Sequence, residues 1–117
     1  RSNTPLQALV TLNDPVYMEA AQALARRIAA VNGSVVEKLN HGFQLCLARA
    51  PQDQERDALL ALYTRGQKRF ESNAAQALAI AANPLGPLPE GAVVADLAAW
   101  TVVGNVLLNL DELLMKP

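Results

Sequence analysis

Residues that start and stop helices recur along this chain and divide it into Ala- and Leu-rich stretches. Thr4 to Gln7 fits a capping box with proline at the first helical position. Asp14 followed by Pro15 repeats the capping residue and the proline, and Ser34 to Glu37 is a second capping box just after Gly33. No stretch alternates apolar and polar residues as a half-buried strand does. The pattern therefore predicts an all-α fold.

The same punctuation places the helix boundaries. Gly33 and Ser34 leave so short a connection that the helices on either side must be antiparallel neighbours. Asn73 can cap a separate Ala-rich helix, but the residues leave open whether 53–82 is one helix or two. The three prolines and two glycines of 83–91 predict a surface loop. The expected helices cover about 5–12, 15–32, 34–48, 53–82 (one helix or two) and 93–114.

Apolar residues spaced three or four apart predict the buried face of each helix. Gly104 in the last helix lowers helix stability by about 1 kcal/mol relative to alanine, and a close helix crossing would account for it. The expected buried sets are Val16, Ala20, Leu24, Ile28 and Val31; Leu39, Phe43, Cys46 and Leu47; Leu59, Leu62, Tyr63 and Phe70; and Leu97, Trp100, Gly104, Leu107 and Leu108.

Length and charge exclude several classes of protein. The 117 residues suit a single domain, 1–117, and 51% hydrophobic content is ample for a core. A net charge of −1 gives no reason to expect nucleic-acid binding. No apolar run is long enough for a membrane span, so membrane insertion is not expected. Arg65, Lys68 and Arg69 form the nearest approach to a basic patch, and a solvated helix face is the favoured interpretation.

The residues show no catalytic or metal-binding constellation. His41 is the only histidine and Cys46 the only cysteine, so two-histidine and thiolate metal motifs are absent. We expect His41 on the polar side of its helix and Cys46 in the core as an inert residue. Asp53, Glu55 and Asp57 lie at the expected start of a helix, where carboxylates interact favourably with the positive end of the helix dipole. This role is favoured over that of a catalytic acid pair as in a glycosidase.

Two polar clusters interrupt the apolar pattern near the ends of the chain. In the favoured interpretation, Thr4 and Asp14 cap helices while asparagines satisfy backbone groups at turns. The alternative is that the clusters meet and form a surface for a ligand or a neighbouring domain. The candidate residues are Arg1, Asn3, Gln7, Asn13 and Asp14 in the first cluster, and Asn109, Asp111 and Glu112 in the second.

Three segments of the chain form a distinctive set: an opening block over residues 1–10, 12–15 and 19–21, a helix and proline break over 43–51, and a closing motif over 98–100 and 106–112. Together these segments resemble a known family, the planctomycete PSD-type domain or domain-of-unknown-function family 1553. The chain departs from the pattern at two places. Leu113 stands where a Phe is usual in the family, and Gly104-Asn105 stands where Ala-Arg is usual. If that arginine has a function in relatives, this chain cannot perform it.

The resemblance implies a setting rather than a reaction. Such domains lie at the C-terminal end of large exported proteins, often after a cytochrome-c-like segment. It therefore implies an extracytoplasmic location, upstream domains of the same polypeptide as partners, and a haem, if any, on an upstream domain. The start at Arg1 without methionine fits the expectation of a C-terminal fragment of a larger multidomain protein.

From the residues and the resemblance together, we expect an irregular or orthogonal bundle of about five helices. Its short N-terminal helix would pack against the last helix. The expected function is that of a non-catalytic module that stabilises or docks its neighbours, without a cofactor in this chain. The alternative is an accessory part of an enzyme that acts on extracellular polymer, with the candidate residues along one edge of a cleft. The oligomeric state is left open.

Overall fold

The computed structural model describes residues 15–115 and the side chains of residues 17–110. Within that range the chain forms five helices and no strand, which confirms the predicted all-α class and the number of about five helices. The expected short helix over 5–12 lies outside the described residues, and so does its packing. The helices are α1 (Pro15–Ala29), α2 (Val35–Leu47), α3 (Asp53–Glu71), α4 (Ala74–Ala82) and α5 (Val94–Met115).

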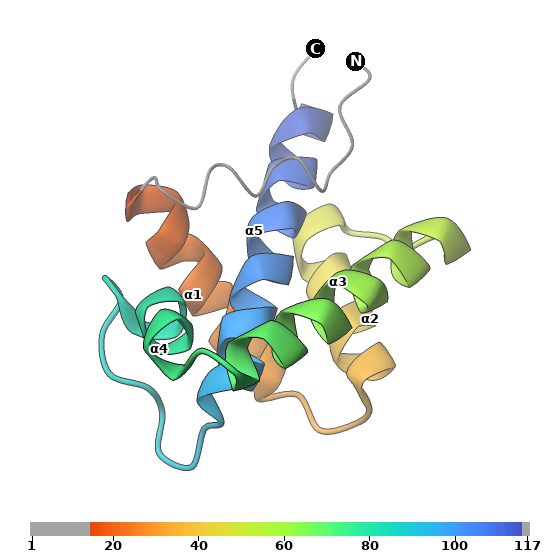
Figure 1. Ribbon diagram of the computed structural model, residues 1–117. Coiled ribbons are helices and arrows are strands. Elements are labelled where there is room, and N and C mark those ends of the chain that lie inside the picture. Colours follow the sequence, from red (N-terminus) through yellow and green to blue (C-terminus); the bar gives the residue numbers. More distant parts are fainter. Residues whose placement is uncertain (1–14, 116–117) are drawn as a thin grey trace.

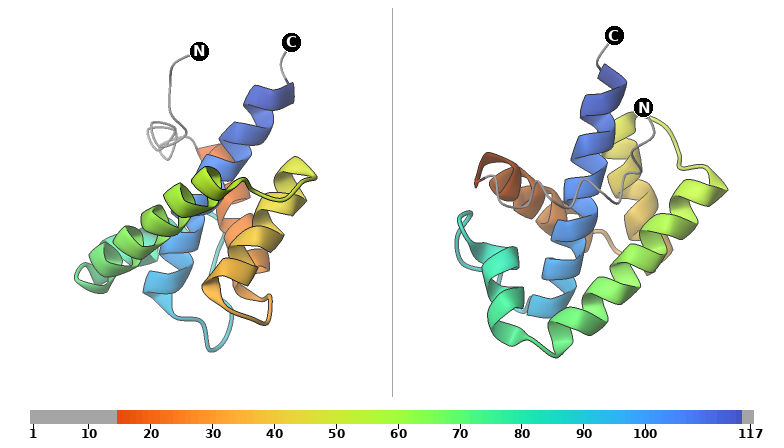
Figure 2. Two further views of the ribbon diagram at one scale, coloured as in Figure 1. Left: turned by 90° about the vertical axis from the view of Figure 1, so that its right-hand side faces the viewer. Right: turned by 45° about the horizontal axis from the view of Figure 1, so that its top comes forward.

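The last helix forms the centre of the bundle. In Figures 1 and 2, α5 runs between the other four helices, and each of them contacts it. Leu97, Trp100, Gly104 and Leu107 are buried as predicted, but every other residue between Leu97 and Leu107 is buried too, so burial is not confined to one face. Leu108, expected to be buried, is only half-buried. A helix that is apolar on all sides belongs at the centre of a bundle, where neighbours cover every face.

The corner between α1 and α2 follows the predicted capping chemistry. Ser34 accepts a hydrogen bond from the Glu37 amide, and the Glu37 carboxylate accepts one from the Ser34 amide, which confirms the capping box. Gly33 has a positive φ of 141°, a conformation that glycine adopts without strain. The first helix ends at Ala29 rather than near residue 32. The Lys38 ammonium on α2 donates to the carbonyls of Ala29 and Val31 and satisfies that helix end.

The stretch 53–82 is two helices. Asn73 caps the second of them, since its side chain accepts a hydrogen bond from the Gln76 amide at 3.1 Å. The short break at residues 72–73 turns α4 away from the axis of α3, as the right-hand view of Figure 2 shows. All four side chains predicted to face inward on α3 are buried, namely Leu59, Leu62, Tyr63 and Phe70.

The buried face of α1 overlaps the predicted face only in part. Ala20 is exposed, whereas Ala21 and Ala25 are fully covered beside the correctly predicted Leu24 and Ile28. Because five of the fifteen residues of this helix are alanine, hydrophobicity alone did not define which of them face the core. On α2, Leu39 and Phe43 are buried as expected. Three residues assigned to the buried sets are only half-buried, namely Val31, Cys46 and Leu47, and the side chain of Val16 lies outside the described ones.

Gly104 marks a close crossing between α1 and α5, as predicted. A Cβ atom built on this residue would lie 3.1 Å from the backbone oxygen of Ala21 and 3.4 Å from Cδ2 of Leu24. Small residues at such a point allow two helix backbones to approach closely. The crossing places the buried middle of α5 against the face of α1 that carries Ala21 and Gln22.

Candidate functional site

Most of the predicted site residues fall where the structure gives no description. Arg1, Asn3, Gln7, Asn13 and Asp14 lie outside the described residues. Asp111 and Glu112 belong to α5, but their side chains are not among the described ones. Asn109 is half-buried, and its amide donates to the Asn105 carbonyl at 2.8 Å within the same helix. The convergence of the two polar clusters therefore stays a prediction.

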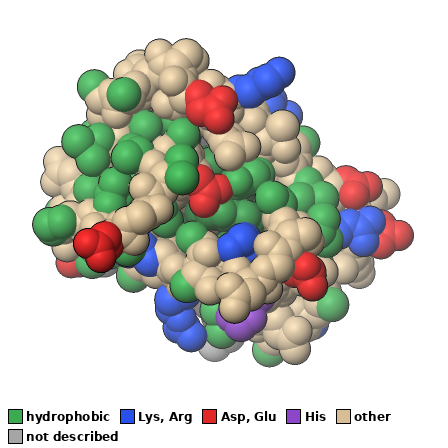
Figure 3. Space-filling view, turned by 90° about the horizontal axis from the view of Figure 1, so that it is seen from below, with side chains coloured by type: hydrophobic (Ala, Val, Ile, Leu, Met, Phe, Trp, Pro, Cys, Tyr) green, Lys and Arg blue, Asp and Glu red, His purple; other side chains and the backbone are tan. Residues whose placement is uncertain are grey.

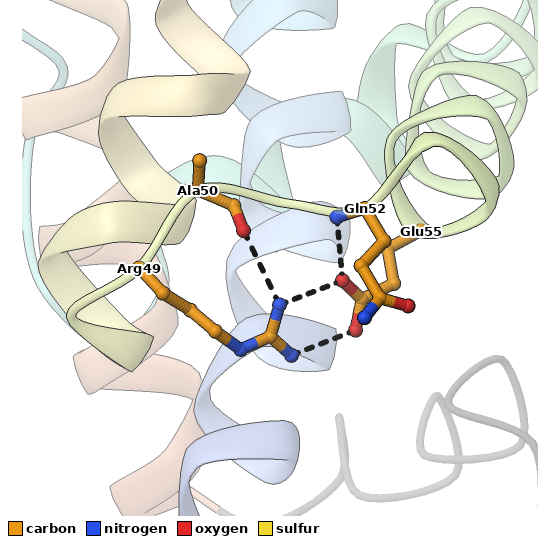
Figure 4. A network of polar contacts seen from close by, with 4 residues as sticks. All are labelled: Arg49, Ala50, Gln52 and Glu55. Atoms are coloured by element: carbon orange, nitrogen blue, oxygen red, sulfur yellow. Dashed lines mark hydrogen bonds and ion pairs between the residues drawn. The ribbon is translucent and has the colours of Figure 1, made fainter.

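His41 and the carboxylates of α3 lie where the sequence predicted them, on the helix surface and at the helix start. His41 is exposed on α2. Glu55 forms a bidentate ion pair with Arg49, with both oxygen–nitrogen distances at 2.9 Å, and also accepts the Gln52 amide (Figure 4). Arg56 pairs with the exposed carboxylates of Asp53 and Asp57 at 3.2 and 3.4 Å. These acids serve the start of α3, as a helix dipole favours.

The Arg49–Glu55 network stabilises the corner between α2 and α3. The hydrogen bonds from Arg49 lower the pKa of the Glu55 carboxyl below its ordinary value, with a further contribution from the Gln52 amide. The Arg49 guanidinium also lies 5.0 Å from the centre of the Phe43 ring, a cation–π distance. The pair is partly open to solvent, so its contribution to stability is modest. Its geometry indicates a structural corner rather than a reactive one.

Gln22 holds the end of α4 against α1, and the sequence reasoning did not single it out. Its side chain is fully buried. The amide nitrogen donates to the carbonyls of Ile80 at 2.7 Å and Asn83 at 2.8 Å, and the amide oxygen accepts from the Leu85 amide at 3.0 Å. One glutamine thus satisfies three backbone groups where α4 ends and the chain turns through a cis Asn83–Pro84 bond.

Arg26 continues this contact one turn further along α1. Its guanidinium donates to the Gly86 carbonyl at 2.7 Å and lies 3.5 Å from the Ala81 carbonyl. Leu85, Gly86 and Leu88 are half-buried, so the predicted surface loop is in part anchored to the bundle. The only sequence signal for this anchoring is the presence of Gln22 among the alanines of a buried helix face.

Tyr63, Asp96 and Trp100 form a cluster where α3 packs against α5. The Tyr63 hydroxyl donates to the Asp96 carboxylate, joining α3 to the first turn of α5. The Tyr63 and Trp100 rings lie with their centres 4.3 Å apart at an angle of 33°. Burial raises the pKa of the Tyr63 hydroxyl well above its ordinary value, and the hydrogen bond to Asp96 raises it further. The phenol therefore acts as a neutral hydrogen-bond donor.

We expect the Tyr63→Phe substitution to lower stability by about 1–2 kcal/mol at neutral pH, because Asp96 loses its donor. The raised pKa also predicts an alkaline effect. Above about pH 10 the unfolded chain releases the Tyr63 proton while the folded chain retains it, so wild-type stability falls as pH rises. Urea unfolding between neutral pH and about pH 11 should show this fall reduced in Tyr63→Phe. An equal alkaline loss in Tyr63→Phe and wild type would contradict the assignment.

A hollow of about 410 Å³ lies between α3, α4 and α5, and we call it the α3–α4 hollow. Its walls are mainly apolar, and two arginines, Arg65 and Arg69, stand one helical turn apart among its lining residues. The spacing of Arg65 and Arg69 around the inward-facing Leu62 and Phe70 was the sequence signal for this site. The lining residues are Leu62, Arg65, Gly66, Arg69, Phe70, Gln76, Ile80 and Val102.

Among residues 15–115, no three side chains of the His, Cys, Asp and Glu types lie where they could together hold a metal ion. No helix in the same range combines the length and the hydrophobicity needed to cross a lipid bilayer.

Comparison with known proteins identifies a family for the chain but no characterised relative. No curated protein and no solved structure matches it. Residues 1–63 match the model of the family PSD1, described as a protein of unknown function (DUF1553). The match covers more than half of the 117 residues and includes the segment with the predicted hallmark block. The chain therefore belongs to the PSD1 family of proteins of unknown function, DUF1553.

Proposed function

We propose that this domain is a non-catalytic helical module that docks the domains preceding it in a large exported polypeptide. The observation that carries the proposal is the use of its buried polar groups. Gln22 and Thr101 are fully covered, and both hydrogen-bond to backbone groups of the bundle. Tyr63 binds Asp96 of a neighbouring helix. Gln22 joins α1 to the end of α4 and Tyr63 joins α3 to α5, while the Thr101 hydroxyl donates to the Leu97 carbonyl within α5. These polar groups thus serve the packing of the bundle.

The surface supports docking through apolar contacts. Seen from below, hydrophobic side chains gather over the middle of one face, with charged side chains around and among them (Figure 3). Among the described side chains, the most exposed large hydrophobic residues are Val93, 63% exposed just before α5, and Leu78, 52% exposed on α4. Valine and leucine exposed to this degree are well suited to burial against a partner domain.

The wider setting of the proposal rests on the sequence resemblance. Residues 1–10 and 106–112 resemble the opening and closing motifs of a planctomycete family whose members end exported, cytochrome-c-associated polypeptides. We propose the same extracytoplasmic location here, with any haem held by an upstream domain. In this arrangement the partners of the module are domains of its own polypeptide.

The test is association in trans. This chain is produced alone and mixed with the remainder of the polypeptide, which lacks it. Calorimetry and size-exclusion chromatography then measure the complex. We expect a complex, and we expect Val93→Glu or Leu78→Glu to weaken it at least tenfold by placing a charge in an apolar contact. Ala79→Glu, at an exposed position on α4, is the matched control.

Two results would contradict the proposal. One is the absence of association when both parts are folded by circular dichroism. The other is a loss of polymer-degrading activity in the full-length protein on Asp111→Ala or Glu112→Ala, which would favour the accessory enzyme role. Fractionation of cells that produce the full-length protein tests the location separately, since the proposal expects it outside the cytoplasm.

A further inference from the structure

We propose that the α3–α4 hollow binds an amphipathic anion, that is, a molecule with one carboxylate or phosphate head on an apolar body. This inference goes beyond the docking role and is independent of it. None of the residues that line the hollow is Val93 or Leu78. The inference depends on three features of the hollow: its walls, its rim and the absence of partners for the charges on that rim.

The walls provide an apolar lining of suitable size. Leu62, Phe70 and Val102 come from two helices and are 6%, 4% and 7% exposed, so each is fixed by packing and presents only a small surface to the hollow. Ile80 on α4 is half-buried and forms part of the opposite wall. A volume of about 410 Å³ lies within the range of roughly 300–1,000 Å³ that small-molecule pockets occupy.

The rim carries positive charge. Arg65 and Arg69 are both exposed and stand four residues apart, on the same side of α3. Gln76 on α4 adds an amide that can donate a hydrogen bond from across the hollow. Guanidinium groups bind carboxylate and phosphate oxygens through paired, charge-assisted hydrogen bonds. Apolar walls beneath such a rim match a ligand that is anionic at one end only.

The two charges on the rim have no partner in the described part of the chain. The ion pairs there involve Arg49 and Arg56, and no carboxylate binds Arg65 or Arg69. Like charges four residues apart on a helix repel each other. The C-terminal dipole of α3 favours cations in its last turn, but it does not account for the placement of Arg65 and Arg69 against an apolar hollow. A bound anion would relieve their repulsion.

The experiment measures binding of decanoate to the chain by calorimetry and by NMR shifts, at low salt because screening weakens exposed charges. We expect decanoate to bind, and decanol and acetate to bind at least tenfold more weakly. Shifts should centre on the residues that line the hollow. Arg65→Gln or Arg69→Gln should weaken decanoate binding about three- to tenfold, and the double variant more, because charge-assisted hydrogen bonds are lost.

Lys68→Gln is the matched control, since it removes an exposed cation of the same helix that does not line the hollow. It should change the affinity less than twofold. Decyl phosphate, measured alongside decanoate, identifies the preferred head, and preference for either one supports the proposal. Equal binding of decanol and decanoate would overturn it. An effect of Lys68→Gln equal to that of the arginine variants would also overturn it, provided that the circular dichroism of the variants is unchanged. The same holds for NMR shifts centred on Leu24 and Leu45, which line a different hollow.

Discussion

Replacing Gln22 by leucine is expected to lower the free energy of unfolding by about 3–5 kcal/mol, although leucine is similar in size and more apolar. The reason is the set of backbone groups that the glutamine satisfies. Its amide nitrogen donates to the carbonyls of Ile80 and Asn83, and its oxygen accepts from the Leu85 amide. Leucine would leave these three groups without a partner at a covered position. Each buried polar group left unsatisfied lowers stability by about 1–3 kcal/mol.

The same contact predicts where the damage appears. Gln22 and Arg26 are the side chains through which α1 holds the segment after α4. In Gln22→Leu we therefore expect faster amide hydrogen exchange at Leu85 and Gly86 than the global loss of stability requires. The capped start of α2, at Ser34 and Glu37, should change only with the global stability. This contrast separates a local release of the segment from general destabilisation.

Urea unfolding followed by circular dichroism measures the effect, and Gln44→Leu is the matched control. Gln44 is an exposed glutamine on α2, so its replacement should change stability by no more than about 0.5 kcal/mol. Gln22→Glu should be damaging as well, because a carboxylate oxygen would face the Ile80 and Asn83 carbonyls. A loss below about 1 kcal/mol in Gln22→Leu would show that the hydrogen bonds at Gln22 do not hold the bundle together.

Local chemistry explains which parts of the fold were predictable from sequence. Helix starts depend on a few neighbouring residues, and both Ser34 and Asn73 cap helices as expected. The inward face of α3 was correct because Leu59, Leu62, Tyr63 and Phe70 follow helical spacing in a helix whose two ends are rich in charged residues. There the contrast between apolar and polar side chains is strong enough to define one face.

Where that contrast is weak, the sequence did not decide the packing. Ala20 and Ala21 are the same residue type, yet one is exposed and the other buried, since only the arrangement of neighbouring helices distinguishes them. The middle of α5 is mostly apolar, and its few polar residues, Thr101 and Asn105, are buried as well, so periodicity could not show that it is central. Gln22 was missed for a related reason: its partners are backbone groups about 60 residues away, which no local pattern reveals.

The candidate site shows the same division. The spacing of Arg65 and Arg69 was visible in the sequence, but their role depends on α4, whose position after the break at residues 72–73 was not. Ile80 and Gln76 complete the hollow only because α4 turns back toward α5. For Asn109 the interpretation that it satisfies a backbone group is confirmed, although its partner is the Asn105 carbonyl within the helix rather than a turn.

Adding a methyl group at two glycines should change stability in opposite directions. Gly104→Ala is expected to be destabilising by about 1–2 kcal/mol, and Gly104→Val by about 3 kcal/mol, because the added atoms overfill a close crossing. The new Cβ at Gly104 would lie 3.1 Å from the Ala21 carbonyl oxygen, which belongs to helical backbone and cannot rotate away. Relief would require α1 to move as a whole. That movement would stretch the hydrogen bonds of Gln22 on the next residue.

Gly66→Ala is the matched control on α3, and it should raise stability by about 0.5–1 kcal/mol. Its added Cβ would meet the Cβ and Cα of Ala99 at 3.5 and 3.6 Å, which is ordinary contact, so the gain in helix propensity is not opposed by a clash. Thermal and urea unfolding of the three variants measure the difference. Helix propensity alone predicts that both alanine variants are more stable than wild type. A stabilising Gly104→Ala would therefore mean that the crossing of α1 and α5 relaxes freely, and that its closeness does not depend on glycine.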